Sequence, residues 1–252
     1  MFKASALEYR FRFLLHAVLY TLGFAAPWNY ALHLDPTGPN AHLWGILAVQ
    51  LSRVGAGNIA TAFNLLLAIG IAVAMAGAWL RTWGSAYLGA TIVQSGTMHT
   101  AEAALATGLL QDGPFRHMRN PLYLGTFLHT LALALLMPAS GAVFTIVMIG
   151  VLQVRLILAE EAFLGAQLGA PYAAYCALVP RVMPSLRPRI AGTGLQSAWG
   201  QAVLGEIYMW GVAGSFAIAG WRYDAGLLIK CVIVSLGVSL VARAFAPPKS
   251  AH

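Results

Sequence analysis

Two polar clusters interrupt the long apolar stretches of this chain, and their residue types could do chemistry together. Residues 113–125 read Gly-Pro-Phe-Arg-His-Met-Arg-Asn-Pro-Leu-Tyr-Leu-Gly, a basic segment stiffened by two prolines. Two adjacent acids, Glu160 and Glu161, follow at the end of another apolar run. If both clusters meet at one membrane face, their arginines and carboxylates could hold a polar ligand that carries charges of both signs.

The basic segment has a predictable local geometry. Arg116 and Arg119 are three residues apart, so one helical turn would place both on the same side. The residue before a proline avoids the α region, so Asn120 is expected to end this turn and to cap a new helix that begins at Pro121. The free N–H groups of that helix could bind a carboxylate or a ring nitrogen, and Tyr123 adds a hydroxyl. Ordinary capping and positive-inside rules would also produce such a segment.

The composition places these clusters in a membrane protein. Of the 252 residues, 59% are hydrophobic and only 9% are charged, whereas about a quarter of a soluble domain is charged. We therefore predict an all-α, polytopic transmembrane protein. The two cysteines, Cys176 and Cys231, indicate neither a disulfide framework nor a metal site. The net charge of +7 is carried by residues beside apolar spans, which favours a lipid bilayer over nucleic acid as the partner.

Apolar stretches of sufficient length predict about six membrane spans. These spans cover residues 13–32, 54–80, 121–137, 141–154, 199–220 and 225–242. The third and fourth are expected to form a tight helical hairpin at Pro138. Residues 41–52 are apolar but short, so we interpret them as interfacial or re-entrant, with a seventh span as the alternative. Glu206 must be tolerated within one span, and Lys230 must snorkel from another.

The basic residues predict the orientation of these spans. With six spans, twelve of the fifteen basic residues lie on one side: Lys3, Arg10, Arg12, Arg81, Arg116, Arg119, Arg155, Arg181, Arg187, Arg189, Arg243 and Lys249. Only Arg53, Arg222 and Lys230 lie on the other side. The positive-inside rule then places both termini and residues 81–120 in the cytoplasm, which suggests a bacterial inner membrane.

The ordered set of motifs resembles the isoprenylcysteine carboxyl methyltransferase superfamily. These are integral-membrane methyltransferases that use S-adenosyl-L-methionine, and they include the phospholipid methyltransferases. The resemblance rests on Leu80-Arg-Thr-Trp83 with Leu88-Gly89, Gly113 to Tyr123, Glu160-Glu161-Ala-Phe-Leu164, Gly169-Ala-Pro-Tyr172-Ala-Ala-Tyr175, and Arg181 with Pro184. It extends over residues 60–185, so we expect an N-terminal region at 1–55, a methyltransferase-like core at 56–185 and an added C-terminal helix pair at 186–252.

The resemblance implies a site for S-adenosyl-L-methionine at the cytoplasmic face. The cofactor-binding residues that it implies are Thr107, Leu109, Leu110, Phe115, Asn120, Pro121, Leu122, Tyr123 and Glu160. Two of them depart from the family pattern, because Asn120 replaces a histidine and Phe115 replaces a tyrosine. An asparagine can donate and accept a hydrogen bond but cannot titrate.

Catalytic and substrate-binding residues are assigned with the same reasoning. The cofactor carries cationic groups that a glutamate can face, and a carboxylate that Arg116 or Arg119 can clamp. We assign catalysis to Arg119 and Glu161. A carboxylate acceptor needs no base, whereas a thiol, phenol or amine does, and His117, His99 or Glu161 could provide it. Substrate contacts are assigned to Arg155, Glu206 and Trp210. Glu206 could instead pair with Lys230.

The sequence therefore favours a membrane methyltransferase that uses S-adenosyl-L-methionine. Its acceptor would be apolar or amphipathic, such as an isoprenylcysteine-like carboxylate, a lipid, or a small thiol or phenol. The alternative is an NADPH-dependent membrane reductase of the sterol or steroid type, which the paired acids disfavour because they suit a sulfonium better than phosphates. A transporter is disfavoured because the polar groups collect at one face and not at the bilayer midplane.

Overall fold

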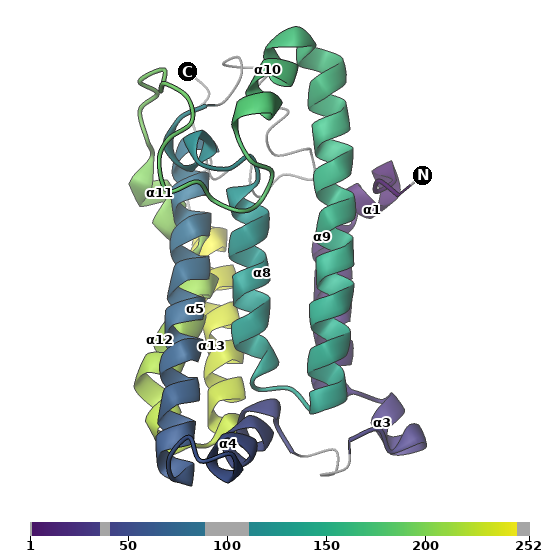
Figure 1. Cartoon of the computed structure of the whole chain (residues 1–252), viewed down its shortest axis with the longest axis vertical. Helices are drawn as coiled ribbons and strands as arrows, with labels where there is room; N and C mark the ends of the chain where they lie inside the picture. Colours follow the sequence, from purple (N-terminus) through teal and green to yellow (C-terminus); the bar gives the residue numbers. More distant parts are fainter. Residues whose placement is uncertain (1, 36–40, 89–110, 246–252) are drawn as a thin grey trace.

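The computed structural model describes residues 2–35, 41–88 and 111–245, and within these ranges every regular element is helical. Six helices follow one long axis (Figure 1). They are α2 (Arg12–Ala25), α5 (Ile59–Leu88), α8 (Pro121–Ala134), α9 (Ala139–Leu168), α12 (Ile207–Ala219) and α13 (Ala225–Phe245). The predicted all-α class is confirmed.

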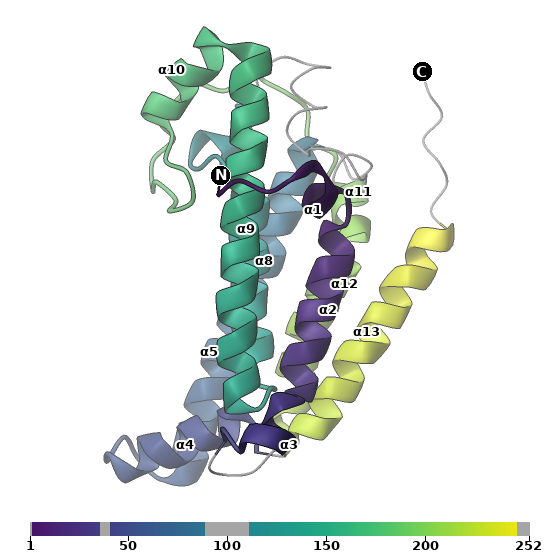
Figure 2. The same ribbon diagram turned by 90° about the vertical axis from the view of Figure 1, so that its right-hand side faces the viewer.

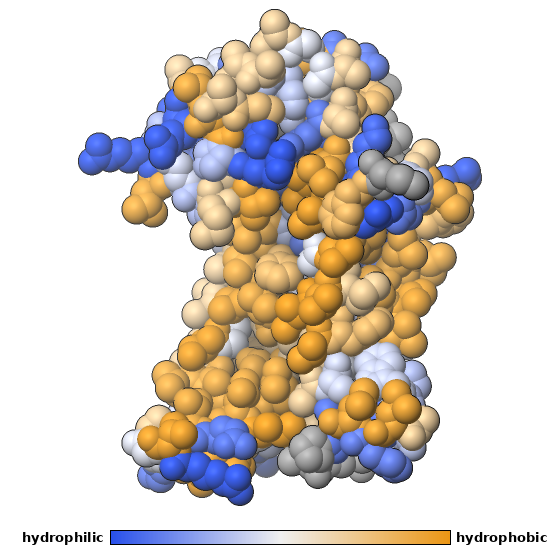
Figure 3. All heavy atoms as spheres, turned by 45° about the vertical axis from the view of Figure 1, so that its right-hand side comes forward, coloured by the Kyte–Doolittle hydropathy of each residue, from blue (hydrophilic) through white to orange (hydrophobic). Residues whose placement is uncertain are grey.

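Shorter elements gather toward the two ends of the bundle. Toward the upper end in Figure 1 lie α1 (Ala6–Arg10), the 3₁₀ helix η1 (Gly113–Arg116), α10 (Ala170–Leu178) and α11 (Trp199–Gly205). Toward the lower end lie α3 (Trp28–Leu32), α4 (Leu43–Arg53) and the 3₁₀ helix η2 (Gly220–Arg222). Figure 3 shows a broad apolar belt between two ends where hydrophilic residues gather, which is the surface expected of a membrane protein.

Length and composition identify three helices that can cross a membrane. They are α5, α9 and residues 225–242 of α13, and a fourth span is counted if the bent pair α11–α12 is taken as one. Helices α2 and α8 contain 14 residues each and run with the bundle, although both are shorter than the length that normally spans the hydrocarbon. The chain is therefore an integral membrane protein, and the count of about six spans stays a prediction.

Several predicted boundaries are wrong. The first predicted span, residues 13–32, is broken because Ala26 adopts a left-handed conformation with φ 37° before Pro27, and α3 then begins separately. The predicted span 199–220 is bent by 66° between α11 and α12. Glu206 lies at this break with φ −110° and ψ 18°, outside helical geometry. The bend lets the Glu206 side chain point back toward α5.

The segment predicted to be interfacial forms α4, which lies across the lower end of the bundle (Figures 1 and 2). Its Trp44 is buried at 2% exposure and donates from Nε1 to the carbonyl oxygen of Phe63 at 3.2 Å. The backbone N–H of Leu43 donates to the carbonyl oxygen of Met137 at 2.8 Å, so α4 is fastened to the α8–α9 turn. Its 11 residues are too few to cross a bilayer.

Helices α5 and α8 pack closely, and two glycines permit it. A Cβ atom at Gly77 would lie 2.7 Å from the carbonyl oxygen of Gly125, and one at Gly125 would lie 2.8 Å from that of Gly77. Neither distance is tolerated by real side chains, so both positions require glycine. This approach brings Arg81 of α5 beside Thr126 of α8, where the polar groups of the bundle begin.

Candidate active site

A cavity of about 810 Å³ lies inside the bundle, lined by residues of α2, α5, α8, α9, α12 and α13. Its upper part is bordered by charged and polar groups, including Arg12, Arg81, Tyr123 and Glu206. Its lower part is mostly apolar. The cavity opens toward the surroundings between α2 and α13, because Phe13 and residues of α13 such as Leu240 both line it and are exposed. Figure 2 shows that these two helices diverge toward the upper end.

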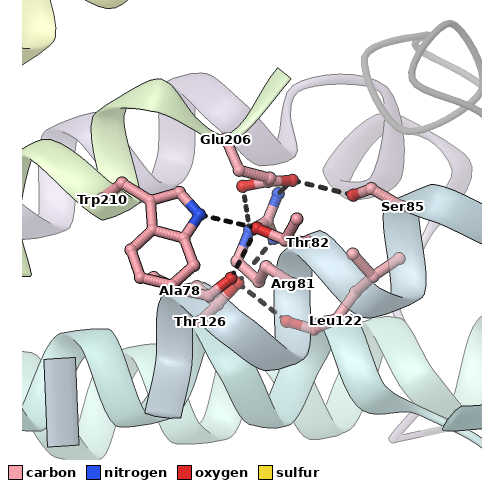
Figure 4. A network of polar contacts seen from close by, with 8 residues as sticks. All are labelled: Ala78, Arg81, Thr82, Ser85, Leu122, Thr126, Glu206 and Trp210. Carbon is pink, nitrogen blue, oxygen red and sulfur yellow. Dashed lines mark hydrogen bonds and ion pairs between the residues drawn. The ribbon is translucent and has the colours of Figure 1, made fainter. Parts of the chain in front are cut away.

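An arginine–glutamate pair forms the charged wall of this cavity (Figure 4). Arg81 donates from Nε and Nη2 to the two carboxylate oxygens of Glu206 at 2.7 and 2.9 Å, a bidentate arrangement. Arg81 also donates to Thr126, and the hydroxyl of Ser85 donates to Glu206 at 2.9 Å. Glu206 is 3% exposed and Arg81 is 16% exposed, so the carboxylate is buried and both of its oxygens are hydrogen-bonded. The expected pairing of Glu206 with Lys230 is therefore wrong.

Glu160 lies among tyrosines at the upper end of the cavity. It is 2% exposed and accepts hydrogen bonds from the hydroxyls of Tyr123 at 3.0 Å and Tyr9 at 3.3 Å. Arg12 stacks its guanidinium over the ring of Tyr9, 4.7 Å from the centroid. Tyr123 both lines the cavity and contacts Glu160. The cavity therefore meets the predicted cofactor residues through Tyr123.

Glu161, the next residue of α9, faces a different group. Consecutive helical residues point about 100° apart, so the two acids cannot share one pocket. Oε1 of Glu161 accepts from Asn120 Nδ2 at 3.1 Å and lies 3.4 Å from Arg119 Nε, and its Oε2 accepts from Arg181 Nε at 2.9 Å. The side chain of Asn120 also donates to the carbonyl oxygen of Arg181 at 3.0 Å. Asn120 is the N-cap residue of α8, as predicted, but its side chain makes no hydrogen bond to the start of that helix.

The basic segment is covered by the chain that follows α10. His117 and Arg116 share backbone hydrogen bonds with Ser185 and Arg189, and Arg116 Nε donates to the carbonyl oxygen of Ile190. Arg116 and Arg119, which were expected on one side of a helical turn, thus have separate partners. Asp112 accepts from the backbone N–H groups of Thr193 and Gly194. Burial alone would raise the pKa of Asp112, but these hydrogen bonds and one from the Thr193 hydroxyl lower it overall.

The remaining predicted residues are placed as follows. Thr107, Leu109 and Leu110 lie outside the described residues, as does His99. Phe115 is buried against Leu88 and Leu122, and its carbonyl oxygen accepts from Tyr175. Pro121 and Leu122 open α8, and Leu122 lines the cavity.

Two of the three predicted substrate residues are not among the cavity lining. Arg155 pairs with Glu8 of α1 at 2.8 Å, away from the cavity. Trp210 donates from Nε1 to the hydroxyl of Thr82 at 2.9 Å and holds α12 against α5 (Figure 4). Only Glu206 of the three borders the cavity.

Among the cavity or site residues that received no functional role from the sequence are Tyr9, Arg12, His16 and Arg81. Arg12 and His16 are four residues apart, so they share one face of α2, and this spacing is a signal that could have been used. The His16 Nδ1 lies 2.6 Å from the carbonyl oxygen of Arg12. Arg81 was placed in a motif and on the cytoplasmic side, yet no local pattern indicated its partner 125 residues away.

Fold and site together define an integral membrane protein with a charged cavity inside a helical bundle. Residues 65–170 match the phospholipid methyltransferase family. The matched stretch includes most of α5 and the whole α8–α9 hairpin, so the resemblance predicted from the sequence is confirmed over these residues, and it supports a membrane methyltransferase. Comparisons with curated proteins and with solved structures gave no match. Arg12, His16 and Glu206 lie outside the matched stretch.

Proposed function

We propose that the protein transfers a methyl group from S-adenosyl-L-methionine to an apolar or amphipathic acceptor that enters the cavity from the lipid. One observation carries this proposal: the cavity reaches Tyr123, and Tyr123 is bonded to Glu160, the acid expected to face the cofactor. The family match over residues 65–170 supports the methyltransferase class. Nothing in that match or in the described residues favours the reductase.

The described residues fit a cationic cofactor. Glu160 is a buried carboxylate, and Tyr9 and Tyr123 bring aromatic rings that attract cations as well as hydroxyls that orient the carboxylate. Together with Asn120, Pro121 and Leu122, they would hold the cofactor beside the upper end of the cavity. S-adenosyl-L-methionine would supply an electrophilic methyl group on its sulfonium. The protein's part is then positioning, which dominates an in-line displacement.

Glu161 and Arg119 were predicted to be catalytic, and their contacts favour a positioning role. Glu161 already accepts hydrogen bonds from Asn120 and Arg181, with Arg119 beside it. These contacts engage both carboxylate oxygens of Glu161. We propose that this group fixes Asn120 and the start of α8.

His16 is the better candidate for a base if the acceptor is a thiol, phenol or amine. It lines the cavity, and its Nδ1 faces the carbonyl oxygen of Arg12. A carbonyl can only accept, so Nδ1 carries the proton and Nε2 of the neutral ring is left unprotonated. A carboxylate acceptor would not need this base.

The acceptor is expected to enter sideways. The cavity opens between α2 and α13, where its exposed lining residues Phe13 and Leu240 are apolar, so a lipophilic acceptor can reach it without leaving the bilayer. The cofactor is soluble in water and would approach from the upper end. The basic residues concentrate there, so the positive-inside rule assigns this end to the cytoplasm.

A ligand-stabilisation experiment tests the proposal. S-adenosylhomocysteine should raise the unfolding temperature of the purified protein, because a ligand that binds only the native state stabilises it by about 2.7 kcal/mol at a hundredfold excess over Kd. NADPH, tested in parallel, should have no effect. Stabilisation by NADPH and not by S-adenosylhomocysteine would replace the methyltransferase with the reductase.

A further inference from the structure

The cavity has a second polar level, deeper than its charged upper part. On α8, His129 follows Tyr123 by six residues, which is about 9 Å along the helix axis. On α9, which runs in the opposite direction, Gln153 precedes Glu160 by seven residues, about 10 Å in the same sense. Both His129 and Gln153 line the cavity. We call these two residues the inner pair.

Three nitrogen atoms of the inner pair lack hydrogen-bond partners within the described part of the chain. His129 is 1% exposed and neither of its ring nitrogens is hydrogen-bonded, and Gln153 is 4% exposed with an unpartnered Nε2. Neighbouring polar groups are already engaged. The hydroxyls of Tyr20 and Thr130 contact each other at 2.6 Å, and Tyr208 meets the His129 ring edge-on, with centroids 5.2 Å apart.

Burying these unpaired nitrogens lowers the stability of the protein unless a ligand or a water forms hydrogen bonds with them. Buried polar groups in folded proteins nearly always have partners, and an unpaired one carries its full desolvation penalty. At this depth the lipid offers no hydrogen bonds. Leucine or phenylalanine would fill the same space without that cost, so the choice of histidine and glutamine at a cavity wall points to a ligand.

We propose that the inner pair is a subsite for a second polar group of the ligand. The ligand then has a polar group at each end. One lies near Arg81 and Tyr123, and the other, an oxygen or nitrogen function, lies about 9–10 Å deeper in the cavity. Nε2 of Gln153 donates, and His129 donates from one ring nitrogen and accepts at the other. A hydroxyl or carbonyl group matches both. A plain acyl or prenyl chain, whose inner end is hydrocarbon, does not.

This inference rests on the proposed function only where it identifies the ligand with the methyl acceptor. It narrows the acceptor class to molecules with oxygen or nitrogen at both ends, such as hydroxylated or carbonyl-bearing rings and chains. An ordered water bound to the inner pair is the competing occupant. A ligand with an oxygen at its inner end would displace such a water and replace its hydrogen bonds. A ligand whose inner end is hydrocarbon cannot replace those hydrogen bonds.

Two probes of equal length test the subsite directly: heptanediol with a hydroxyl at each end, and heptanol. The apparent affinity of each is measured from the concentration dependence of the unfolding temperature. The wild-type protein should prefer the diol by about threefold to tenfold, the range for one or two neutral hydrogen bonds. Gln153→Leu and His129→Phe should each reduce this preference. His42→Phe is the matched control, because the buried Nδ1 of His42 is also unpartnered but His42 does not line the cavity.

The stability of Gln153→Leu without any probe gives an independent readout. Because Nε2 has no partner in the chain, the variant should unfold at the same temperature as the wild type or higher. Equal affinity of the wild type for both probes, an unchanged preference in Gln153→Leu, or a lower unfolding temperature of that variant would each overturn the subsite. S-adenosylhomocysteine binding is measured on the same samples. If S-adenosylhomocysteine does not bind, the proposed function is wrong, but the comparison of the two probes still tests the subsite.

Discussion

Glu161 and Glu206 are both held by arginines, yet their surroundings differ. Glu161 lies near the polar upper end and is shared by Arg119 and Arg181, the second of which is 51% exposed. Glu206 is 3% exposed inside the bundle and is clasped by Arg81 beside an apolar cavity. Glu161 and its arginines hold the segment after α10 against the start of α8. Glu206 and Arg81 place opposite charges inside the bundle, where the lipid cannot solvate them.

The comparison teaches that burial decides how strongly each charge depends on its partner. Around Glu161, which is 11% exposed, Arg119 is 12% exposed and Arg181 is 51% exposed, so water can replace a lost partner on the Arg181 side. Inside the bundle it cannot, so removal of Arg81 or Glu206 leaves an uncompensated charge. The same ion-pair chemistry should therefore respond differently to the same kind of substitution, and this difference can be measured.

The largest effect is expected at the buried pair. Glu206→Leu should destabilise the protein by about 3–5 kcal/mol, because it leaves the Arg81 charge buried and unpaired. The double variant Arg81→Met with Glu206→Leu should recover most of this loss, since it removes both charges. Unfolding in detergent measures both. A single variant as stable as the wild type would show that the pair is not buried in the native bundle.

Glu161→Gln should have a smaller effect. Hydrogen bonds to charged groups are worth about 1.5–3 kcal/mol, and the partial exposure of Arg181 reduces this, so we expect about 1 kcal/mol. The same unfolding measurement applies. A loss equal to that of Glu206→Leu would mean that burial does not distinguish the two groups.

The upper connection also predicts a pH dependence through Asp112. Its folded pKa lies below the ordinary value of 3.8, so its contribution is present at higher pH and is lost as the pH falls through the folded pKa. Proteolytic cleavage within residues 185–198 should therefore become faster as the pH falls below about 4. In Asp112→Asn this segment should be cleaved readily at neutral pH as well. Equal protection of the variant and the wild type at neutral pH would contradict the role of Asp112.

The smallest effect is expected at the pair of Glu8 and Arg155, which lies outside the cavity. The hydrogen bond from Arg155 lowers the pKa of Glu8 from 4.5 to about 2, so the contribution is present above about pH 4.5 and is lost as the pH falls toward 2. For so exposed a pair the expected contribution is about 0.2–1 kcal/mol, and added salt should weaken it. If Glu8→Gln lowered the free energy of unfolding by the same amount at low and at high salt, the pair would not act as an exposed ion pair.

Local sequence rules predicted the parts of the fold that local chemistry decides. The hairpin turn at Pro138 is confirmed, since a proline fixes its own φ and cannot continue the preceding helix. Pro121 begins α8 as expected. The all-α membrane class followed from composition alone.

Contacts between distant segments could not be predicted in this way. The partner of Arg81 lies 125 residues away. Gly205, the last residue of α11, stands directly before the bend at Glu206, but a glycine does not indicate which distant residue Glu206 will pair with. The side chain of Asn120 satisfies Glu161 and the carbonyl oxygen of Arg181 and does not cap α8, because tertiary partners outcompeted the local one. Tyr9 reaches Glu160 from a segment outside the recognised motifs.

The central claim is that Glu160 faces the cofactor while Glu161 holds the structure beside it, and the affinity of purified variants for S-adenosylhomocysteine tests this most directly. Glu160→Gln should weaken binding about tenfold or more, because a charge-assisted contact is worth about 1.5–3 kcal/mol. Glu161→Gln, which keeps the same size and lies one residue away, should change the affinity by less than about threefold, under 1 kcal/mol. Equal effects of the two substitutions, or no effect of Glu160→Gln in a folded protein, would contradict the account.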